Sequence, residues 1–284
     1  MNPIFSRPLK ALFAIMMLAL LAGCGSSSTV SPFQPTRVVG LGDGYNDVNA
    51  TVREGSSTDT VVQQMAAYFG QSNVVSYASS GQKIADLASQ ITTATNAGGF
   101  SSGDLVVITV GTHDVISDPT GTNLTQAKSD LVAAVQSILT AGAKHVLIMP
   151  VLEVSLTPWG RSTSFDANAT NTFNDGILGA LGTAFGGQSA NTVIYANASN
   201  LTVTFRTATS TALAYAPFTD TGYGGTAPAC GSGSVVNTAW TGCAVGSASA
   251  SYTTMLFADG IHLTPAGNRW AAGFLYNATA AGWR

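Results

Sequence analysis

Two residues near the C-terminus have the types and the spacing of a catalytic base with its partner. Asp259 precedes His262 by three positions, and a carboxylate so close to an imidazole can orient the ring and stabilise its protonated form. An imidazole held in this way accepts a proton from a hydroxyl group near neutral pH, which is the chemistry of acyl transfer and ester hydrolysis. Asp259 and His262 are therefore candidates for such chemistry.

Three more segments offer polar or glycine residues directly after short apolar runs. They are Gly42-Asp43-Gly44-Tyr45-Asn46-Asp47, Ala78-Ser79-Ser80-Gly81 and Gly111-Thr112-His113-Asp114. The carboxyl ends of parallel strands lie at one edge of a sheet, and the ligands of α/β proteins bind there. We therefore expect these three segments to meet residues 259–262 at that edge.

The apolar runs and the periodic segments between them predict the elements that hold these residues. Short runs predict strands at 37–41, 74–77, 105–110, 145–149 and 192–195. Helical patterns cover 58–68, 84–94, 124–141, 165–185 and 264–280, the last opened by Thr264-Pro265. Strands that alternate with helices of this length predict an α/β fold, a three-layer α/β/α sandwich around a parallel five-stranded sheet.

The four polar segments, in this order and spacing, resemble the sequence blocks of the SGNH (GDSL) hydrolases, a family of esterases, lipases and carbohydrate deacetylases. The resemblance covers essentially the whole mature chain and is most specific at 259–267. It implies the flavodoxin-like fold of that family, in which the Asp orients the His and the His is the general base for a Ser after the first strand. The family's oxyanion hole combines the N–H of that Ser, the N–H of a Gly in the second block and an Asn side chain in the third.

Two positions depart from the family pattern. Gly44 stands where the family has its nucleophilic Ser, and His113 stands where it has Asn. Gly44 has no side chain and cannot form an acyl-enzyme. The resemblance still implies an oxyanion hole, because Gly44 and Gly81 keep their N–H groups and a neutral His113 can donate a hydrogen bond where the Asn amide would lie.

Other groups can take the place of the missing nucleophile. His262 can activate a water molecule directly, or a displaced hydroxyl of Tyr45, Ser79 or Ser80 can act, although a serine in a turn is as readily explained by the turn itself. The neighbouring carboxylates of Asp43 and Asp47 are predicted to be hydrogen-bond acceptors that stabilise their loop.

A metal site is the other chemistry that these residues allow. His113, His262 and either Asp43 or Asp259 would make a set of two histidines and one carboxylate. Nothing in the spacing requires such a set, and the pairing with Asp259 already explains His262. We therefore predict no metal and no cofactor, and a structural role for His145 at the start of a strand.

The first residues have the pattern of an export signal. Residues 1–23 combine Arg7 and Lys10 with a thirteen-residue apolar run that is too short to span a bilayer. The run ends in Leu-Ala-Gly-Cys24, which resembles the lipobox of bacterial lipoproteins, so Cys24 is the predicted lipidation site and 24–35 the tether. No Asp follows Cys24, and this resemblance implies an outer-membrane location, on the periplasmic or the surface face.

The composition limits the partners of the mature domain, predicted at 36–284. Among 284 residues only 9% are charged, with 11 Lys and Arg against 14 Asp and Glu. Loss of the signal removes two cations and no acid, which leaves nine against fourteen. A surface so poor in cations cannot track phosphates, so we expect no nucleic-acid partner. We expect a monomer.

A Gly/Ser/Thr-rich stretch at 203–258 shows little periodicity and is predicted to be a long excursion from the fold. It contains Cys230 and Cys243, and an exported compartment allows them to form a disulfide.

Two hypotheses of different kinds follow. The first is an outer-membrane lipoprotein of the SGNH ester hydrolase family that acts on an ester or on an acylated glycan or lipid, with activity impaired because Gly44 replaces Ser. The alternative is a non-catalytic pseudo-hydrolase of the cell envelope that binds an acyl or glycan ligand in the same cleft.

Overall fold

The structure is a computed structural model, and it describes residues 32–48, 60–186, 192–198, 256–281 and 283. The helices and strands described all belong to one compact unit, Gln34–Arg284. The predicted signal at 1–23, the lipidation site Cys24, the pair Cys230 and Cys243, and the excursion up to residue 255 lie outside the described residues.

The centre of the fold is a parallel sheet of five strands, as predicted. They are β1 (Arg37–Gly42), β2 (Val74–Ser76), β3 (Asp104–Thr109), β4 (His145–Met149) and β5 (Val193–Tyr195). Their order in the sheet is β2-β1-β3-β4-β5, which is the flavodoxin-like order, and every neighbouring pair is parallel. The register places Gly42 beside Thr109 and Thr109 beside Met149, so the central strands end level with one another.

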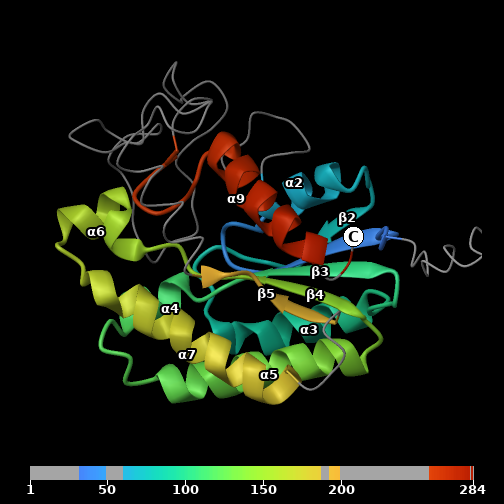
Figure 1. Ribbon diagram of the computed structural model, residues 1–284, viewed down its shortest axis with the longest axis horizontal. Helices are drawn as coiled ribbons and strands as arrows, with labels where there is room; N and C mark the ends of the chain where they lie inside the picture. Colours follow the sequence, from blue (N-terminus) through green and yellow to red (C-terminus); the bar gives the residue numbers. More distant parts are fainter. Residues whose placement is uncertain (1–31, 49–59, 187–191, 199–255, 282, 284) are drawn as a thin grey trace, which may run out of the picture. The chain divides into compact units, whose positions relative to one another are not determined.

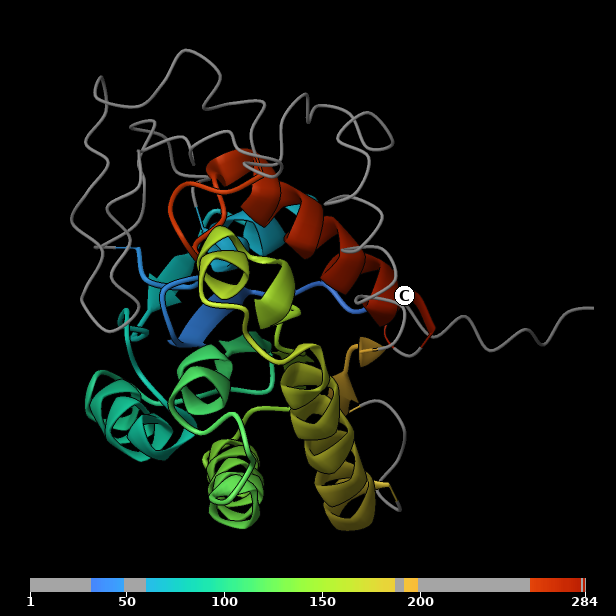
Figure 2. The same ribbon diagram turned by 90° about the vertical axis from the view of Figure 1, so that its left-hand side faces the viewer.

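Helices cover both faces of the sheet (Figure 1). One face carries α2 (Val61–Tyr68) and α9 (Pro265–Ala278), and the other carries α3 (Leu87–Asn96), α5 (Leu124–Thr140) and α7 (Ala167–Phe185). The view of Figure 2 shows the same three layers from the side, with the red α9 and α2 on one side of the strands and α3, α5 and the yellow α7 on the other. The predicted three-layer sandwich is therefore confirmed.

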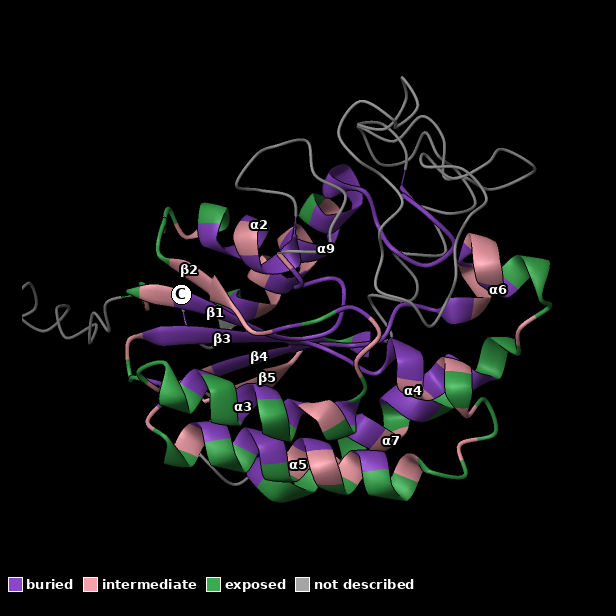
Figure 3. Cartoon of the chain, turned by 180° about the vertical axis from the view of Figure 1, so that it is seen from behind, coloured by how far each residue is buried: buried purple, intermediate pink, exposed green. Residues whose placement is uncertain are grey.

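The buried residues lie where the layers meet. All six residues of β3 are buried, which explains the unbroken apolar run at 105–108 in this strand (Figure 3). On α5 one apolar face is buried, including Leu131, Val135 and Ile138, while the opposite side of the helix is exposed. Burial of these aliphatic side chains is the main contribution to the stability of such a core.

Local signals in the sequence explain where the helices begin. Thr60 and Gln63 form a reciprocal capping box at the start of α2. Thr264 caps α9 by accepting a hydrogen bond from the N–H of Gly267 at 3.1 Å, with Pro265 in the first turn, as the sequence predicts. Asp166 caps α7 through the N–H of Asn168.

The structure differs from the sequence prediction in its short elements. Helices α4 (Thr112–Ser117) and α6 (Pro158–Ser162) were not predicted, because elements of one or two turns are too short to show a hydrophobic period. Residues 256–258 were predicted to belong to the excursion but are buried, and Phe257 pairs with Leu263 in front of α9. Within the described part of the chain, no helix is long and apolar enough to cross a membrane.

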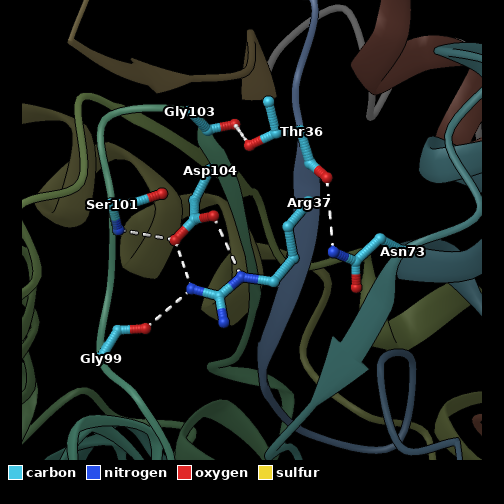
Figure 4. Close-up of polar contacts among 7 residues, drawn as sticks. All are labelled: Thr36, Arg37, Asn73, Gly99, Ser101, Gly103 and Asp104. Atoms are coloured by element: carbon cyan, nitrogen blue, oxygen red, sulfur yellow. Dashed lines mark hydrogen bonds and ion pairs between the residues drawn. The ribbon is translucent and has the colours of Figure 1, made fainter.

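An ion pair fastens the amino ends of the two central strands (Figure 4). The Arg37 guanidinium donates to both carboxylate oxygens of Asp104, at 3.0 and 2.5 Å, and also to the carbonyl of Gly99 at 2.7 Å. Asp104 further accepts from the N–H of Ser101 at 2.7 Å, and its side chain is only 1% exposed.

We expect Arg37→Met to lower the free energy of unfolding by about 3 kcal/mol, because it leaves the buried Asp104 carboxylate without its cation. Urea denaturation measures the loss. The matched control is Arg37→Met combined with Asp104→Asn, which removes the uncompensated charge and should recover part of the stability. A loss below about 1 kcal/mol for Arg37→Met would mean that the pair behaves as an exposed one.

Candidate active site

The four polar segments of the sequence lie together at the carboxyl edge of the sheet. The loop after β1 contacts the loop before α9, because the hydroxyl of Tyr45 donates to the carbonyl of Ile261 at 2.8 Å. It also contacts the loop after β2, where the N–H of Ser80 donates to Asp47 at 2.8 Å. The third segment, after β3, forms the first turn of α4. His113 in this turn is near His262, because the charge of the His262 imidazole contributes to lowering the pKa of His113.

Asp259 and His262 form a buried acid–base pair. Nδ1 of His262 lies 2.8 Å from Oδ2 of Asp259, and the other carboxylate oxygen accepts from the backbone N–H groups of Ile261 and His262 at 2.9 and 2.7 Å. The two residues are 3% and 8% exposed. A carboxylate on Nδ1 favours the tautomer that carries its proton there, which leaves the ring lone pair on Nε2.

The electrostatics of this pair suit a general base. Burial by itself lowers the pKa of His262, but the Asp259 carboxylate, with smaller contributions from Asp43 and Asp47, outweighs burial and raises it above its usual value. For Asp259 burial acts in the opposite direction, and the charge and hydrogen bonds of His262 outweigh it and lower the pKa. The pair is therefore an ionised carboxylate beside an imidazole of enhanced basicity.

The loop that carries this pair is held from several sides. The N–H of Ala258 donates to the carbonyl of His262 at 2.8 Å, and the N–H of Trp159 on α6 donates to the carbonyl of Gly260 at 2.9 Å. The hydroxyl of Tyr45 completes this support at Ile261. Because that hydroxyl is used in a buried hydrogen bond, Tyr45 is a positioning residue for His262, and the hypothesis that it is a displaced nucleophile has no geometric support.

The space next to Gly44 is filled by the imidazole of His262. A Cβ atom added to Gly44 would lie 2.6 Å from Nε2 and 2.8 Å from Cδ2 of His262, and 3.1 Å from Oγ of Ser80. The first two distances are shorter than real Cβ contacts, so a serine at position 44 would require the imidazole to move. The imidazole of His262 therefore occupies the space that a side chain at position 44 would need.

The start of this loop is fixed by another glycine. Gly42 has φ +110°, and a Cβ there would lie 1.9 Å from the carbonyl oxygen of Thr109 on the neighbouring strand. Both backbone groups of Gly42 are paired with the side chain of Gln90, at 2.7 and 2.8 Å. Gln90 was not singled out from the sequence; the only signal was a polar residue on the inner side of the predicted helix 84–94.

The two carboxylates of the loop are buried and accept backbone hydrogen bonds. Asp43 accepts from the N–H of Tyr45 at 3.3 Å, and Asp47 accepts from Ser80. Burial raises the pKa of Asp43 to about 7, against the opposing effects of that hydrogen bond and of the His262 charge. Asp43 therefore changes its charge near neutral pH, and its charge interacts with that of His262.

Each of the three oxyanion-hole candidates has a polar group without a hydrogen-bond partner among the described residues. The backbone N–H groups of Gly44 and Gly81 make no hydrogen bond within the described residues. His113 is 3% exposed, and its Nδ1 has no hydrogen-bond partner among those residues. Burial, helped by repulsion from His262 and Lys83, lowers the pKa of His113 to about 4, so its ring is neutral and has one N–H to donate.

The structure also places the two serines, the alternative metal ligands and His145, which are the remaining candidates from the sequence. Ser79 is exposed, whereas Ser80 is buried beside Gly44. No group of three or more His, Cys, Asp or Glu side chains with metal-site geometry exists in the described ranges, so the alternative set around His113 and His262 is not assembled there. His145 begins β4, at the opposite end of the sheet, and its ring contacts Trp283 edge-on at 5.1 Å.

A parallel sheet in this strand order, with an Asp–His pair just before the last helix, defines the architecture of the SGNH hydrolases. The chain belongs to the GDSL-like lipase/acylhydrolase family, whose model matches residues 38–274. No curated protein sequence matches the chain.

Two solved structures share the fold over nearly their whole length. The acetyl xylan esterase AlAXEase is 20% identical, with a TM-score of 0.51 over 85% of this chain and 98% of that one. A protein assigned as a GDSL-like lipase from Parabacteroides merdae ATCC 43184 is 13% identical, with a TM-score of 0.53 over 88% and 99%. At these identities the likeness concerns the fold alone.

Proposed function

We propose that this protein is an ester hydrolase of the bacterial cell envelope whose turnover is limited by the absence of a serine at position 44. The observation that carries the proposal is the position of the His262 base. Its Nε2 is oriented by Asp259 and lies directly against Gly44, at the place where the family activates its nucleophile.

The remaining groups have complementary roles in such a reaction. His262 takes the proton of the attacking hydroxyl, and Asp259 stabilises the imidazolium that forms. Gly44, Gly81 and the neutral His113 donate to the developing oxyanion. Sites that have lost a member of their triad keep roughly 10³- to 10⁴-fold catalysis over water, so a slow but specific activity is expected.

The location and the substrate class rest on the sequence. The lipobox ending in Cys24 supports an outer-membrane lipoprotein, tethered through 24–35. The family supports an ester or an acylated glycan or lipid as the substrate. An acetylated xylan is a suitable member of that class for assays, because one protein of the same fold is an acetyl xylan esterase.

The test is hydrolysis of p-nitrophenyl acetate and of acetylated xylan by the purified native protein and by His262→Ala. We expect slow, saturable hydrolysis by the native protein and a fall to the background rate in His262→Ala, because the variant has no base. Equal rates in the two proteins would reject the proposal. Globomycin, which blocks lipoprotein signal cleavage, should cause the unprocessed precursor to accumulate in cells, and a chain unaffected by it would reject the anchor.

A second candidate function is binding without turnover. It is favoured by one observation, the contact between the imidazole and Gly44, which leaves no room for a serine without movement. In this case the native protein binds a short acyl ester or an acetylated glycan but does not hydrolyse it. Equilibrium binding of acetylated xylan fragments, with no product formed, would support this alternative.

A further inference from the structure

We infer that Ser80 supplies the hydroxyl that position 44 lacks, so that the nucleophile of this site comes from the loop after β2. The inference rests on the proposed ester hydrolase activity and names the residue that forms the covalent bond.

The first support is the position of the Ser80 side chain. Its Oγ lies 3.1 Å from the point where a Cβ of residue 44 would lie, and Nε2 of His262 lies 2.6 Å from the same point. The hydroxyl and the base therefore flank the space of the missing serine, separated by less than the sum of these two distances. We expect rotation about the side-chain dihedral of Ser80, together with a shift of the imidazole, to bring them into hydrogen-bond contact when substrate binds, because catalytic hydrogen bonds often tighten only then.

The second support is that the Ser80 hydroxyl is not used elsewhere. Ser80 is 8% exposed, yet its Oγ makes no hydrogen bond in the described part of the chain. Its backbone is nevertheless fixed, because the N–H donates to Asp47 at 2.8 Å. A hydroxyl with a fixed backbone and no hydrogen-bond partner in the described residues, next to a histidine base, has the features of a nucleophile.

The third support is the turn that holds Ser80. The N–H of Gln82 donates to the carbonyl of Ser79 at 3.3 Å, and Gly81 has φ +84°, so Ser80 lies at the tip of a tight turn. The residue after it, Gly81, is an oxyanion-hole candidate. A nucleophile on a sharp turn, followed by a residue whose N–H stabilises the oxyanion, is the arrangement of the nucleophile elbow in α/β-hydrolases.

The chemistry balances with groups already present. Nε2 of His262 takes the proton of Ser80 as Oγ attacks the ester carbonyl carbon, and the carbonyl electron pair moves onto oxygen. When the tetrahedral intermediate collapses, the C–O bond to the alcohol breaks and His262 returns the proton to the leaving oxygen. Water, activated by the same imidazole, then cleaves the acyl-Ser80 ester and releases the carboxylic acid.

The test uses the full chain and a fluorophosphonate probe, followed by peptide mass spectrometry, together with the p-nitrophenyl acetate assay. We expect the label on Ser80, no label in Ser80→Ala or His262→Ala, and a loss of at least 10-fold in turnover for Ser80→Ala. Ser79→Ala is the matched control, because it removes an exposed hydroxyl one position away and should keep both label and turnover. Ser80→Ala retains the backbone hydrogen bond to Asp47, and thermal unfolding checks its fold.

The outcomes separate this inference from the proposed function. Hydrolysis that depends on His262 but persists in Ser80→Ala, with no label on Ser80, overturns the inference and leaves the ester hydrolase, with water as the nucleophile. Neither hydrolysis nor label in the native protein overturns both. A label on Ser80 that requires His262, without turnover of any ester, supports the nucleophile and counts against the proposed function.

Discussion

Gly44→Ser is expected to increase the turnover of p-nitrophenyl acetate by at least about 100-fold over the native protein. In hydrolases of this chemistry, loss of the nucleophile lowers kcat by up to about 10⁶-fold, so restoring a hydroxyl beside an intact base has a large possible gain. The base and its orienting carboxylate are already in place, at 2.8 Å from each other.

The gain is limited by space. The new Cβ would lie 2.6 Å from Nε2 of His262, so the imidazole must move away by several tenths of an ångström before the serine fits. This movement is feasible because Nε2 is at the end of a side chain, but it disturbs the hydrogen bond to Asp259. We therefore expect a rate below that of an intact triad.

Gly44→Ala is the matched control for this gain. It adds the same Cβ, which crowds His262 and Ser80, but it supplies no hydroxyl that could act as a nucleophile. We expect its turnover to fall below that of the native protein. If Gly44→Ser were no faster than Gly44→Ala, the remaining groups would not be arranged for catalysis, and the binding function would be favoured.

The sequence was sufficient to predict the fold because its signals are local and regular. Strand β3 has an unbroken apolar run at 105–108 and α5 has a clear buried face, so element type and order follow from these patterns. The start of α9 follows from Thr264-Pro265. Helices α4 and α6 were missed because no period can develop in five or six residues.

The site could be predicted only as a set of segments. The blocks around Gly44, Gly81, His113 and His262 were identified because strand ends of a parallel sheet share an edge. Their detailed contacts depend on side-chain packing between residues far apart in the chain. The support of Ile261 by Tyr45, across 216 positions, and the contact of His262 with Gly44 have no local signal.

The pH dependence of turnover is expected to depend strongly on Asp259. His262 acts as a base only when its imidazole is neutral, and its pKa is raised above the usual value by the charge of Asp259 against the effect of burial. Turnover is therefore lost as pH falls through this raised pKa, and the acid limb of the profile should have its midpoint above about 6.5.

Asp259→Asn should change both the height and the midpoint of this profile. Without the carboxylate, burial dominates and lowers the pKa of His262, so the midpoint moves to lower pH. The plateau should fall by about 10²- to 10⁴-fold, because an amide neither fixes the Nδ1–H tautomer nor stabilises the imidazolium. Exposure of the ring by a loosened fold would return the midpoint only to about 6.5, so a midpoint below this value identifies the loss of the carboxylate in a folded site.

Asp114→Asn is the control for this shift. Burial raises the pKa of Asp114 to about 6, so this carboxyl titrates in the same range and lies in the segment that carries His113. It holds the N–H of Ile84 at 3.0 Å, an acceptor role that an amide oxygen retains, and it has no part in raising the pKa of His262. If the midpoint moved in Asp114→Asn and not in Asp259→Asn, the acid limb would report the titration of Asp114, and His262 would not be the base. If it moved only in Asp259→Asn, the activity would depend on the Asp259–His262 pair.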